Sequence, residues 1–396
     1  MVLKVIPIYI HIYVYLVLGY LWYRFILRFI SDIKSKKTYS EYNAKTSIIV
    51  PVYNEKDYLL RLCVESLINA EGDNEIILVD DCSTNNTVKI IKELKKKYPK
   101  IKAIHLKRNR GKRYAQYYGL KFANGEIVIT IDSDTIIKKD AIKEILKPFN
   151  NPKIGAVTGN IRAFNREKNF LTKMIDARYK NAFTFERQGL AAFGIVTCCT
   201  GVLSAYRREY IEKLKEIYVS QKFLGKSCTY GDDRHLTNLF LEIGYKISYV
   251  KNAIAYTEVP TKYKEYIIQQ LRWKKSFIRE SIVIFPYSLK YNPLLALETF
   301  LTFIIPFLSL FARVMIIYLA FIYPLVLIPL ILSICLMAFI RNMLLFFEEP
   351  KAAVYSIPFA LFYELIIYWL YWIALFTLYD TRWGTRGEKK EEAIKV

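Results

Sequence analysis

The stretch that decides the fold is IVITIDSDT, residues 127–135. Its first five residues are apolar or β-branched and predict a short buried strand, which ends at Asp132, Ser133 and Asp134. Two carboxylates one residue apart can share one divalent cation, and hard oxygen ligands suit Mg²⁺ or Mn²⁺ on a nucleotide diphosphate. Alone the pattern is weak, because Asp-x-Asp is also common in solvated turns.

Strands and helices alternate on the N-terminal side of this stretch. Apolar runs at 45–52, 75–79 and 101–105 predict three more strands, and helical spacing covers 57–69, 87–98 and 111–123. This alternation predicts an α/β fold with a parallel, doubly wound sheet that binds ligands at the carboxyl ends of its strands. The pattern loses its regularity beyond about residue 150, where we expect the part of the domain that binds an acceptor substrate.

The composition combines strong positive charge with high apolar content. The 396 residues carry 58 Lys and Arg against 36 Asp and Glu, a net charge of +22, and 53% of them are hydrophobic. This combination indicates a basic soluble domain joined to membrane segments and excludes disorder. Six cysteines in a chain of this length exclude a disulfide scaffold, and we expect all six to be reduced.

The positive charge could bind nucleic acid, an anionic membrane surface or phosphate-bearing substrates. It is densest at residues 89–113, which hold twelve Lys or Arg and one acidic residue, Glu93. We interpret most of this stretch as a solvated helix face. No zinc-finger, helix-turn-helix or RNP-type signature accompanies it, so we expect no nucleic-acid partner.

Apolar residues gather in blocks toward both ends of the chain. Residues 5–23 carry no charge and precede Arg24 and Arg28, which predicts a retained transmembrane helix followed by a cytoplasmic domain. Residues 299–340 are long enough for two spans broken near Tyr323-Pro324, and 352–379 form a third block that contains Glu364. Residues 276–297 mix basic and bulky apolar residues, as an amphipathic interface helix does.

Two polar clusters follow the predicted strands upstream of IVITIDSDT. Asp80-Asp81 could accept hydrogen bonds from a base or a ribose, or could belong to a turn before the next helix. Gly111-Lys112-Arg113 opens a predicted helix, where backbone N–H groups and two cations would hold phosphate. Surface basicity is the alternative for this second cluster.

Two more clusters lie downstream. Gly231-Asp-Asp-Arg234 offers a carboxylate that could act as a general base on a hydroxyl, or could cap the helix that follows. His235 has no ligand partner at metal spacing and is expected to be packed or exposed. Gln269-x-x-Arg272-Trp273 places a cation for phosphate beside an aromatic face for a sugar, although Trp and Arg are also common membrane anchors.

In their order along the chain, these signals resemble the processive, membrane-embedded family 2 glycosyltransferases, and more narrowly the bacterial and viral class I hyaluronan synthases. The matching stretches are VPVYNE (50–55), VDD (79–81), NRGKR (109–113), IDSDT (131–135), NRE (165–167), CTG (199–201), YRR (206–208), GDDR (231–234), QQLRW (269–273) with KS (275–276), and WGTR (383–386). The GDDR and WGTR stretches are more particular to hyaluronan synthases, whereas Asp-x-Asp and Gln-x-x-Arg-Trp also occur in cellulose and chitin synthases. Cys82 stands where the family usually has Gly.

The resemblance implies a GT-A, Rossmann-like nucleotide-sugar domain with α-helical transmembrane segments, which polymerises UDP-GlcNAc and UDP-glucuronate into hyaluronan with Mg²⁺ or Mn²⁺. The residues it assigns are Asp233, Arg272, Trp273 and Gln269 for catalysis; Pro51, Tyr53, Glu55, Asp81, Lys112, Asp132, Arg234, Trp383 and Arg386 for nucleotide-sugar binding; and Asp132 and Asp134 for the metal.

Within this set the resemblance implies separate roles. Asp81 would hold the uridine, and Asp233 would take the proton from the acceptor hydroxyl. Lys112 and Arg272 would stabilise leaving-group charge. Trp273 would stack on the terminal sugar at the mouth of the channel.

The resemblance also implies a division of the chain and a place in the cell. We expect an N-terminal transmembrane helix (1–30), a cytosolic GT-A domain (31–275), an amphipathic interface segment (276–297), transmembrane helices that form a polymer channel (298–379) and a cytosolic tail with the WGTR motif (380–396). The protein would be a multi-pass cell-membrane protein that contacts nascent polysaccharide and lipid, with no obligate protein partner.

One N-terminal and three C-terminal spans would leave the tail outside, whereas the resemblance places the tail at the cytoplasmic site. We therefore expect the block that holds Glu364 to be interfacial or re-entrant, because a carboxyl group at mid-bilayer is costly. Alternatives for the function are a chitin, cellulose or other polysaccharide synthase, a non-processive transferase with a lipid acceptor, and a membrane transporter or scaffold with a non-catalytic domain.

Overall fold

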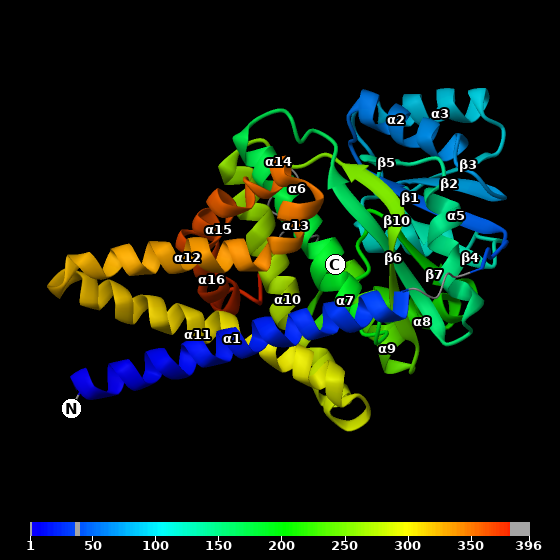
Figure 1. The fold of residues 1–396 in the computed structure, drawn as a ribbon. Helices are drawn as coiled ribbons and strands as arrows, with labels where there is room; N and C mark the ends of the chain where they lie inside the picture. The colour runs from blue at the N-terminus through cyan, green and yellow to red at the C-terminus, as the bar shows by residue number, and fades with distance from the viewer. Residues whose placement is uncertain (1, 36–39, 381–396) are drawn as a thin grey trace.

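The computed structural model describes residues 2–35 and 40–380, and every structural statement below refers to them. One eight-stranded sheet forms the centre of residues 40–262, the half of the protein expected to be catalytic (the catalytic half), in the order β3-β2-β1-β4-β7-β6-β10-β5 (Figure 1). Its strands are β1 Thr46–Val52, β2 Asn74–Asp80, β3 Ile101–His105, β4 Ile127–Thr130, β5 Thr135–Ile137, β6 Ile154–Ala163, β7 Ser204–Arg207 and β10 Lys246–Thr257.

The first four strands are parallel, as the alternating pattern predicts. β1 and β4 are buried along their whole length, which explains why both read as continuous apolar runs. The sheet as a whole is mixed, however, because β7 runs antiparallel to both of its neighbours and β5 runs antiparallel to β10. The parallel arrangement is therefore confirmed for the four strands expected from the sequence, and β5 and β7, which were not expected, make the sheet mixed.

Helices cover the sheet and supply the apolar core. They are α2 Asp57–Ile68, α3 Thr87–Lys97, α4 Lys112–Leu120, α5 Ala141–Leu146, α8 Arg208–Val219 and α9 Asp232–Glu242. The core joins the strand residues Ile48, Ile77 and Ile129 to helix residues such as Leu60 and Ile91, all of them fully buried or nearly so. This rigid core holds the strand ends at one edge of the sheet.

The N-terminal helix α1 (Val2–Ser35) is fixed to the catalytic half. It lies against α7 (Gln188–Ala191) and the π-helical turn η2 (Ala182–Arg187) that follows α6 (Phe170–Asn181) (Figure 1). Arg28 Nε donates to the Thr184 carbonyl and Ser31 Oγ to the Gln188 carbonyl, both at 2.9 Å. The helix therefore has a defined orientation relative to the sheet.

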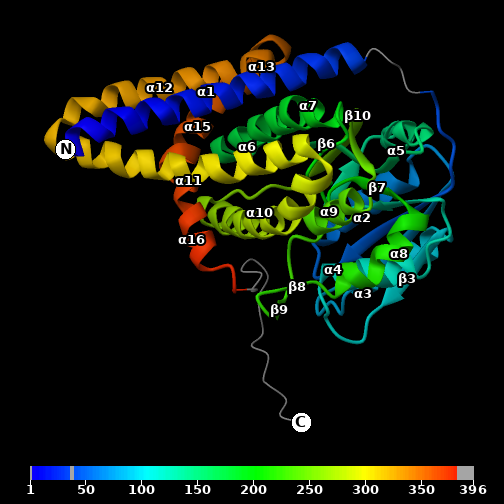
Figure 2. The same cartoon turned by 90° about the horizontal axis from the view of Figure 1, so that it is seen from below.

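Within residues 2–35 and 40–380, two helices are long and apolar enough to cross a membrane: α1 over Tyr13–Lys34, and α11 (Pro293–Ile322). Together with α12 (Leu327–Arg341) they extend from one side of the catalytic half (Figure 2). The break between α11 and α12 falls at Tyr323-Pro324, as the sequence predicts. With fifteen residues, α12 is shorter than the roughly 20 residues that a full span needs.

The last apolar block is bent. α15 (Ser356–Leu365) and α16 (Leu370–Phe376) belong to segments that meet at 42°, and together they have the length and composition of a third span or of a re-entrant loop. Glu364 lies next to this bend and pairs with Arg313 of α11. On α1, Arg24 pairs with the buried Glu298 of α11 at 2.5 Å. Both charge pairs reduce the cost of placing ionised groups among apolar helices.

The segment before the membrane helices differs from its expected form. Residues 276–297 are divided between the end of α10 (Tyr263–Tyr291) and the start of α11, because Asn292 caps the second helix and Pro293 begins it.

The described chain ends close to the catalytic half. The Tyr230 hydroxyl donates to the Asp380 carbonyl at 2.9 Å, and Lys275 Nζ lies 3.3 Å from the Asp380 carboxylate. The described part of the chain therefore ends beside the catalytic half.

Candidate functional site

Three neighbouring parallel strands, β2, β1 and β4, end at the same edge of the sheet. Asp81 follows β2, Tyr53 and Glu55 follow β1, and Asp132 and Asp134 follow β4. This edge opens on a cavity of about 1240 Å³. The predicted residues that line it are Pro51, Tyr53, Glu55, Asp81, Lys112, Asp132, Asp134, Asp233, Arg234, Gln269, Arg272 and Trp273. Trp383 and Arg386 lie outside the described residues.

The buried carboxylate of Asp81 holds the loop that leads into α4. Its two oxygens accept the backbone N–H groups of Arg110 and Gly111, each at 2.8 Å. Gly111 has φ +87°, a conformation that L side chains rarely adopt. The next residue, Lys112, is the first of α4, so Asp81 fixes the start of the helix that carries the cation.

Lys112 reaches from α4 to two carboxylates. Its Nζ lies 2.5 Å from Asp132 Oδ1 and 3.5 Å from Asp232 Oδ2. Burial alone would lower the pKa of Lys112, but Asp132 and Asp232 outweigh it and hold that pKa above its ordinary value. The residue therefore stays cationic and could bind an anion such as phosphate at this edge of the sheet.

Asp134 is the most perturbed carboxyl group at this edge. Burial, together with the nearby charges of Asp132 and Glu55, raises its pKa to about 7. Ser133 Oγ donates to Glu55 at 2.6 Å, which keeps Glu55 near the pair. A divalent cation would relieve this crowding of negative charge, and oxygen ligands are what Mg²⁺ and Mn²⁺ prefer.

Asp132 and Asp134 therefore suit a divalent cation whose remaining ligands come from a substrate. Within the described ranges, no three His, Cys, Asp or Glu side chains are grouped so as to hold a metal by themselves. Two protein carboxylates completed by phosphate oxygens are a usual arrangement for Mg²⁺. Because Asp132 already pairs with Lys112, Asp134 is the more direct candidate ligand.

Asp233 is the second residue of α9, and the N-cap of this helix is Gly231 with φ +78°. Its carboxylate accepts the Arg234 N–H at 2.8 Å and the Cys198 thiol at 3.5 Å. Burial and the neighbouring charge of Asp232 raise the pKa of Asp233, and burial and Asp233 in turn raise the pKa of the Cys198 thiol to about 12. A raised pKa makes Asp233 a better match for proton abstraction near neutral pH.

The adjacent carboxyl group has the opposite shift. Burial would raise the pKa of Asp232, but Lys112 and Arg113 lower it below its ordinary value. Two neighbouring carboxylates thus have different environments: Asp232 pairs with Lys112, whereas Asp233 lines the cavity beside Cys198. Such divergence is typical of acid–base sites.

Helix α10 forms the opposite wall with Gln269, Arg272 and Trp273. Trp273 is 42% exposed, so its ring is accessible to a ligand. The Oε1 atom of Gln269 is buried without a hydrogen-bond partner among the described groups, and it can accept a sugar hydroxyl. Arg272 also lines a second cavity of about 540 Å³, together with Asp134.

Two residues of the site, Gly201 and Cys198, were not among the residues expected from the sequence. A Cβ at Gly201 would fall within 3.0 Å of Lys112 Nζ and 3.4 Å from the Asp132 carboxylate oxygens, so a larger residue would displace Nζ from its present position. Cys198 contacts Asp233 directly. Gly201 belongs to the CTG stretch, so a glycine inside a matched motif was the available signal. Cys198 precedes that stretch and had no such signal.

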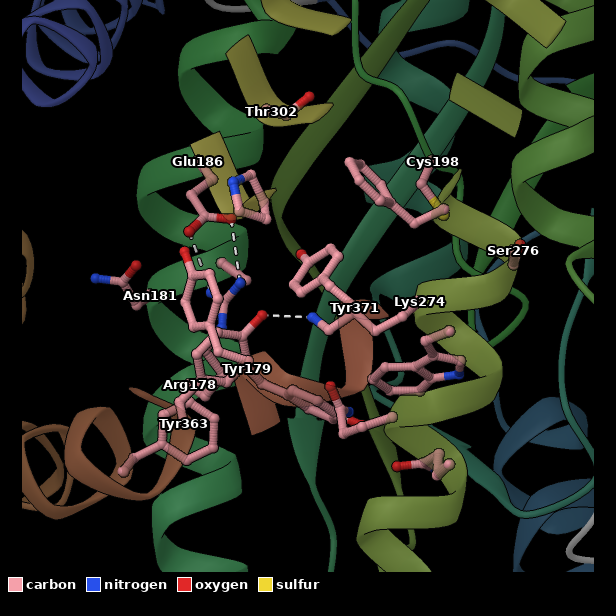
Figure 3. A pocket seen from close by; sticks show the side chains of 18 of the residues that line it. Arg178, Tyr179, Asn181, Glu186, Cys198, Lys274, Ser276, Thr302, Tyr363 and Tyr371 are labelled. Carbon is pink, nitrogen blue, oxygen red and sulfur yellow. Dashed lines mark hydrogen bonds and ion pairs between the residues drawn. The ribbon is translucent and has the colours of Figure 1, made fainter. Parts of the chain in front are cut away.

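The cavity extends from the strand ends to the membrane helices. Tyr13 of α1 and Thr302, Ser309 and Arg313 of α11 line the same space as Asp132. Figure 3 shows part of it, with side chains from α6, α10 and α11 pointing inward. One continuous space therefore connects the predicted nucleotide-sugar site with the apolar helices.

Comparisons with known proteins agree with this geometry. Residues 47–215 match the model of glycosyl transferase family 2. The chain is 35% identical over 351 residues to a hyaluronan synthase of Streptococcus pyogenes, covering 86% of this chain and 83% of that protein. It is 39% identical over 239 residues to an N-acetylglucosaminyltransferase of Rhizobium sp. (strain N33), covering 60% of this chain and about half (53%) of that relative.

A solved structure confirms the fold. The mannosyltransferase PcManGT from Pyrobaculum calidifontis, determined with GDP-Man and Mn²⁺, superposes with a TM-score of 0.65 over 90% of this chain and 98% of that one, at 19% identity. The expected GT-A fold is thus confirmed, and the apolar helices make the chain a membrane protein. A non-catalytic transporter or scaffold is not supported. The chain belongs to glycosyltransferase family 2, as an enzyme that resembles the hyaluronan synthases.

Proposed function

We propose that the protein is a processive, inverting glycosyltransferase that polymerises UDP-GlcNAc and UDP-glucuronate into hyaluronan and passes the polymer through its own membrane helices. The observation that carries this proposal is the single cavity that joins the strand-end carboxylates to α1 and α11. A transferase with a small soluble acceptor would not need that continuity. The hyaluronan synthase relative supports the choice of sugars.

Nucleotide-sugar binding falls to the strand-end edge in this proposal. Asp81 stabilises the loop before α4 and lines the cavity, where it would hold the uridine. A divalent cation, Mg²⁺ or Mn²⁺, held by Asp134 and Asp132 would neutralise diphosphate charge when it is bound. Lys112 and Arg272 stabilise the negative charge that develops on the leaving UDP.

Glycosyl transfer itself falls to α9 and α10. Asp233 takes the proton from the acceptor hydroxyl as its oxygen attacks the anomeric carbon, and UDP leaves from the opposite face. Trp273 supports the terminal sugar by stacking, and Gln269 accepts one of its hydroxyls. Arg234, whose guanidinium lies 5.1 Å from the Phe277 ring centroid, contributes positive charge next to the base.

The orientation is part of the proposal. We place the catalytic half in the cytoplasm, where nucleotide sugars are made, and the protein in the cell membrane as a multi-pass enzyme. The basic residues Arg24 and Arg28 near the inner end of α1 support this orientation. The position of Asp380 beside Lys275 supports a tail on the same side.

The proposed base is tested by Asp233→Asn, which keeps the shape of the side chain and removes its basicity. We expect release of UDP from both sugar nucleotides to fall by about 10²- to 10⁴-fold. The binding of UDP-GlcNAc, measured calorimetrically, should change little. Full turnover by this variant would exclude Asp233 as the base.

A synthase that uses UDP-GlcNAc alone is the second candidate, because the Rhizobium relative is an N-acetylglucosaminyltransferase at 39% identity. The purified protein in lipid nanodiscs is incubated with each sugar nucleotide singly and with both. Hyaluronan synthesis requires both for polymer formation. Polymer from UDP-GlcNAc alone would establish the second candidate.

A further inference from the structure

Lys274 is a buried cation in the cavity with no role in the steps described above. It follows Trp273 on α10 and is 8% exposed. Its Nζ donates to the Tyr363 hydroxyl and lies 4.7 Å from the Tyr363 ring centroid and 4.6 Å from that of Tyr371. Figure 3 shows the side chain extending across the cavity, with the labelled tyrosines around its end.

The ammonium differs from neighbouring cations in its partners. Lys275 lies 3.3 Å from the Asp380 carboxylate, and Arg178 on α6 lies 3.2 Å from Glu186. For Lys274, the part of the chain that the structure describes contributes a phenol and two rings, and no carboxylate oxygen within 4.0 Å. A buried ammonium is costly without an anionic partner, and phenols and rings offset that cost only in part.

The surroundings of Lys274 have the composition of a sugar site. Tyr179, Tyr266, Tyr363 and Tyr371 line the same cavity, beside Trp273. Aromatic rings bind the apolar faces of sugars, while their hydroxyl groups donate or accept hydrogen bonds. An ammonium framed by such rings matches a sugar that carries a carboxylate.

We propose that Lys274, with Tyr363 and Tyr371, forms a polymer subsite that binds the carboxylate of a uronate residue next to the sugar stacked on Trp273. This inference rests on the proposed function, in which every second sugar of the product is acidic. The subsite makes Lys274 a specificity-determining residue, because a neutral polymer leaves the ammonium without an anion. It also retains the polymer between additions.

The test measures binding, so it does not depend on turnover. The full chain in lipid nanodiscs is titrated with a GlcNAc–glucuronate hexasaccharide and with the same hexasaccharide after reduction of its carboxyl groups to alcohols. For the wild-type protein we expect the acidic form to bind at least about tenfold more tightly, as one charge-assisted hydrogen bond provides. Lys274→Met should bring the ratio of the two affinities close to one, and Lys274→Arg should preserve it.

The matched control is Lys290→Met, which removes an exposed lysine from the same helix and should leave the ratio unchanged. If Lys274 only links α10 to α15, Lys274→Met should weaken the binding of both hexasaccharides equally. The ratio of the two affinities would then stay as it is in the wild-type protein. Either that result or equal affinity of the wild-type protein for the two ligands overturns the inference. The wild-type comparison holds even where Lys274→Met does not fold.

The same preparation separates this inference from the proposed function. Synthesis of polymer from both sugar nucleotides, combined with equal binding of the two hexasaccharides, would overturn the subsite and leave hyaluronan synthesis intact. Consumption of UDP-GlcNAc alone would overturn the proposed function, and the uronate subsite with it.

Discussion

The substitution Gly201→Ala is the most specific test of the position of Lys112, the cation proposed to stabilise the leaving phosphate. A Cβ at this position would come closer to Lys112 Nζ than the 3.0 Å that real Cβ atoms keep. Nζ must move by about 1 Å to restore ordinary contact. Because Nζ is the free end of a flexible side chain, the backbone need not shift. The substitution therefore displaces one catalytic cation in an otherwise intact protein.

The size of the effect follows from that displacement. Lys112 Nζ lies 2.5 Å from Asp132 Oδ1, and a movement of about 1 Å lengthens this contact and takes the cation away from the leaving phosphate. Misplacement of a catalytic group by about 1 Å costs on the order of 10²-fold in rate. We therefore expect kcat to fall about 100-fold, whereas the melting temperature in nanodiscs should stay near that of the wild type.

The assay is release of UDP at saturating sugar nucleotide, followed by a coupled reaction. Gly19→Ala is the matched control, since a Cβ there meets no atom within 4 Å. Lys112→Met gives the lower limit of activity. A Gly201→Ala enzyme with unchanged kcat would show that Lys112 need not occupy its place beside Asp132, and it would refute this reasoning.

Three other predictions concern Asp134 and the turn at Gly231. Asp134 must lose its proton to bind Mn²⁺, and its pKa is raised to about 7, so calorimetric Mn²⁺ affinity should rise about tenfold per pH unit below 7 and level off above it. In the metal-free protein, the raised pKa of Asp134 makes the folded state less stable as the pH rises. The folded state holds this proton more tightly than the unfolded state, with its ordinary pKa of 3.8, so this contribution to stability is present below about pH 4 and lost as pH rises through about 7. An Mn²⁺ affinity that is flat from pH 5 to 8 would contradict the assignment of Asp134. Gly231→Ala should destabilise the protein by about 2 kcal/mol or more, because φ is +78° and a Cβ would meet Ser276 Oγ and Arg279. A denaturation midpoint equal to that of the wild type would contradict this.

The parallel half of the fold could be predicted closely from the sequence. Strand and helix boundaries from residue 46 to 130 agree to within a few residues, because buried parallel strands are continuous apolar runs with clear turn signals between them. The direction of β7 could not be predicted. This strand has four residues, and its antiparallel pairing with β4 and β6 depends on contacts between distant segments.

The candidate site could be predicted in its members but not in its contacts. Asp132, Lys112 and Asp233 were found from their motifs, yet the proximity of Gly201 to Lys112 arises only when the sheet assembles. The backbone conformation at Cys82 could be predicted from the sequence. It stands where relatives usually have Gly, and it adopts φ 62°, the left-handed conformation that favours glycine.

We expect the enzyme to make an alternating polymer from two sugar nucleotides. The measurement that tests it most directly is digestion, with a hyaluronan-specific lyase, of the product that the purified protein forms from UDP-GlcNAc and UDP-glucuronate. We expect complete conversion to unsaturated disaccharides, with equal incorporation of the two sugars. A polymer that resists the lyase, or one that contains GlcNAc alone, would contradict it.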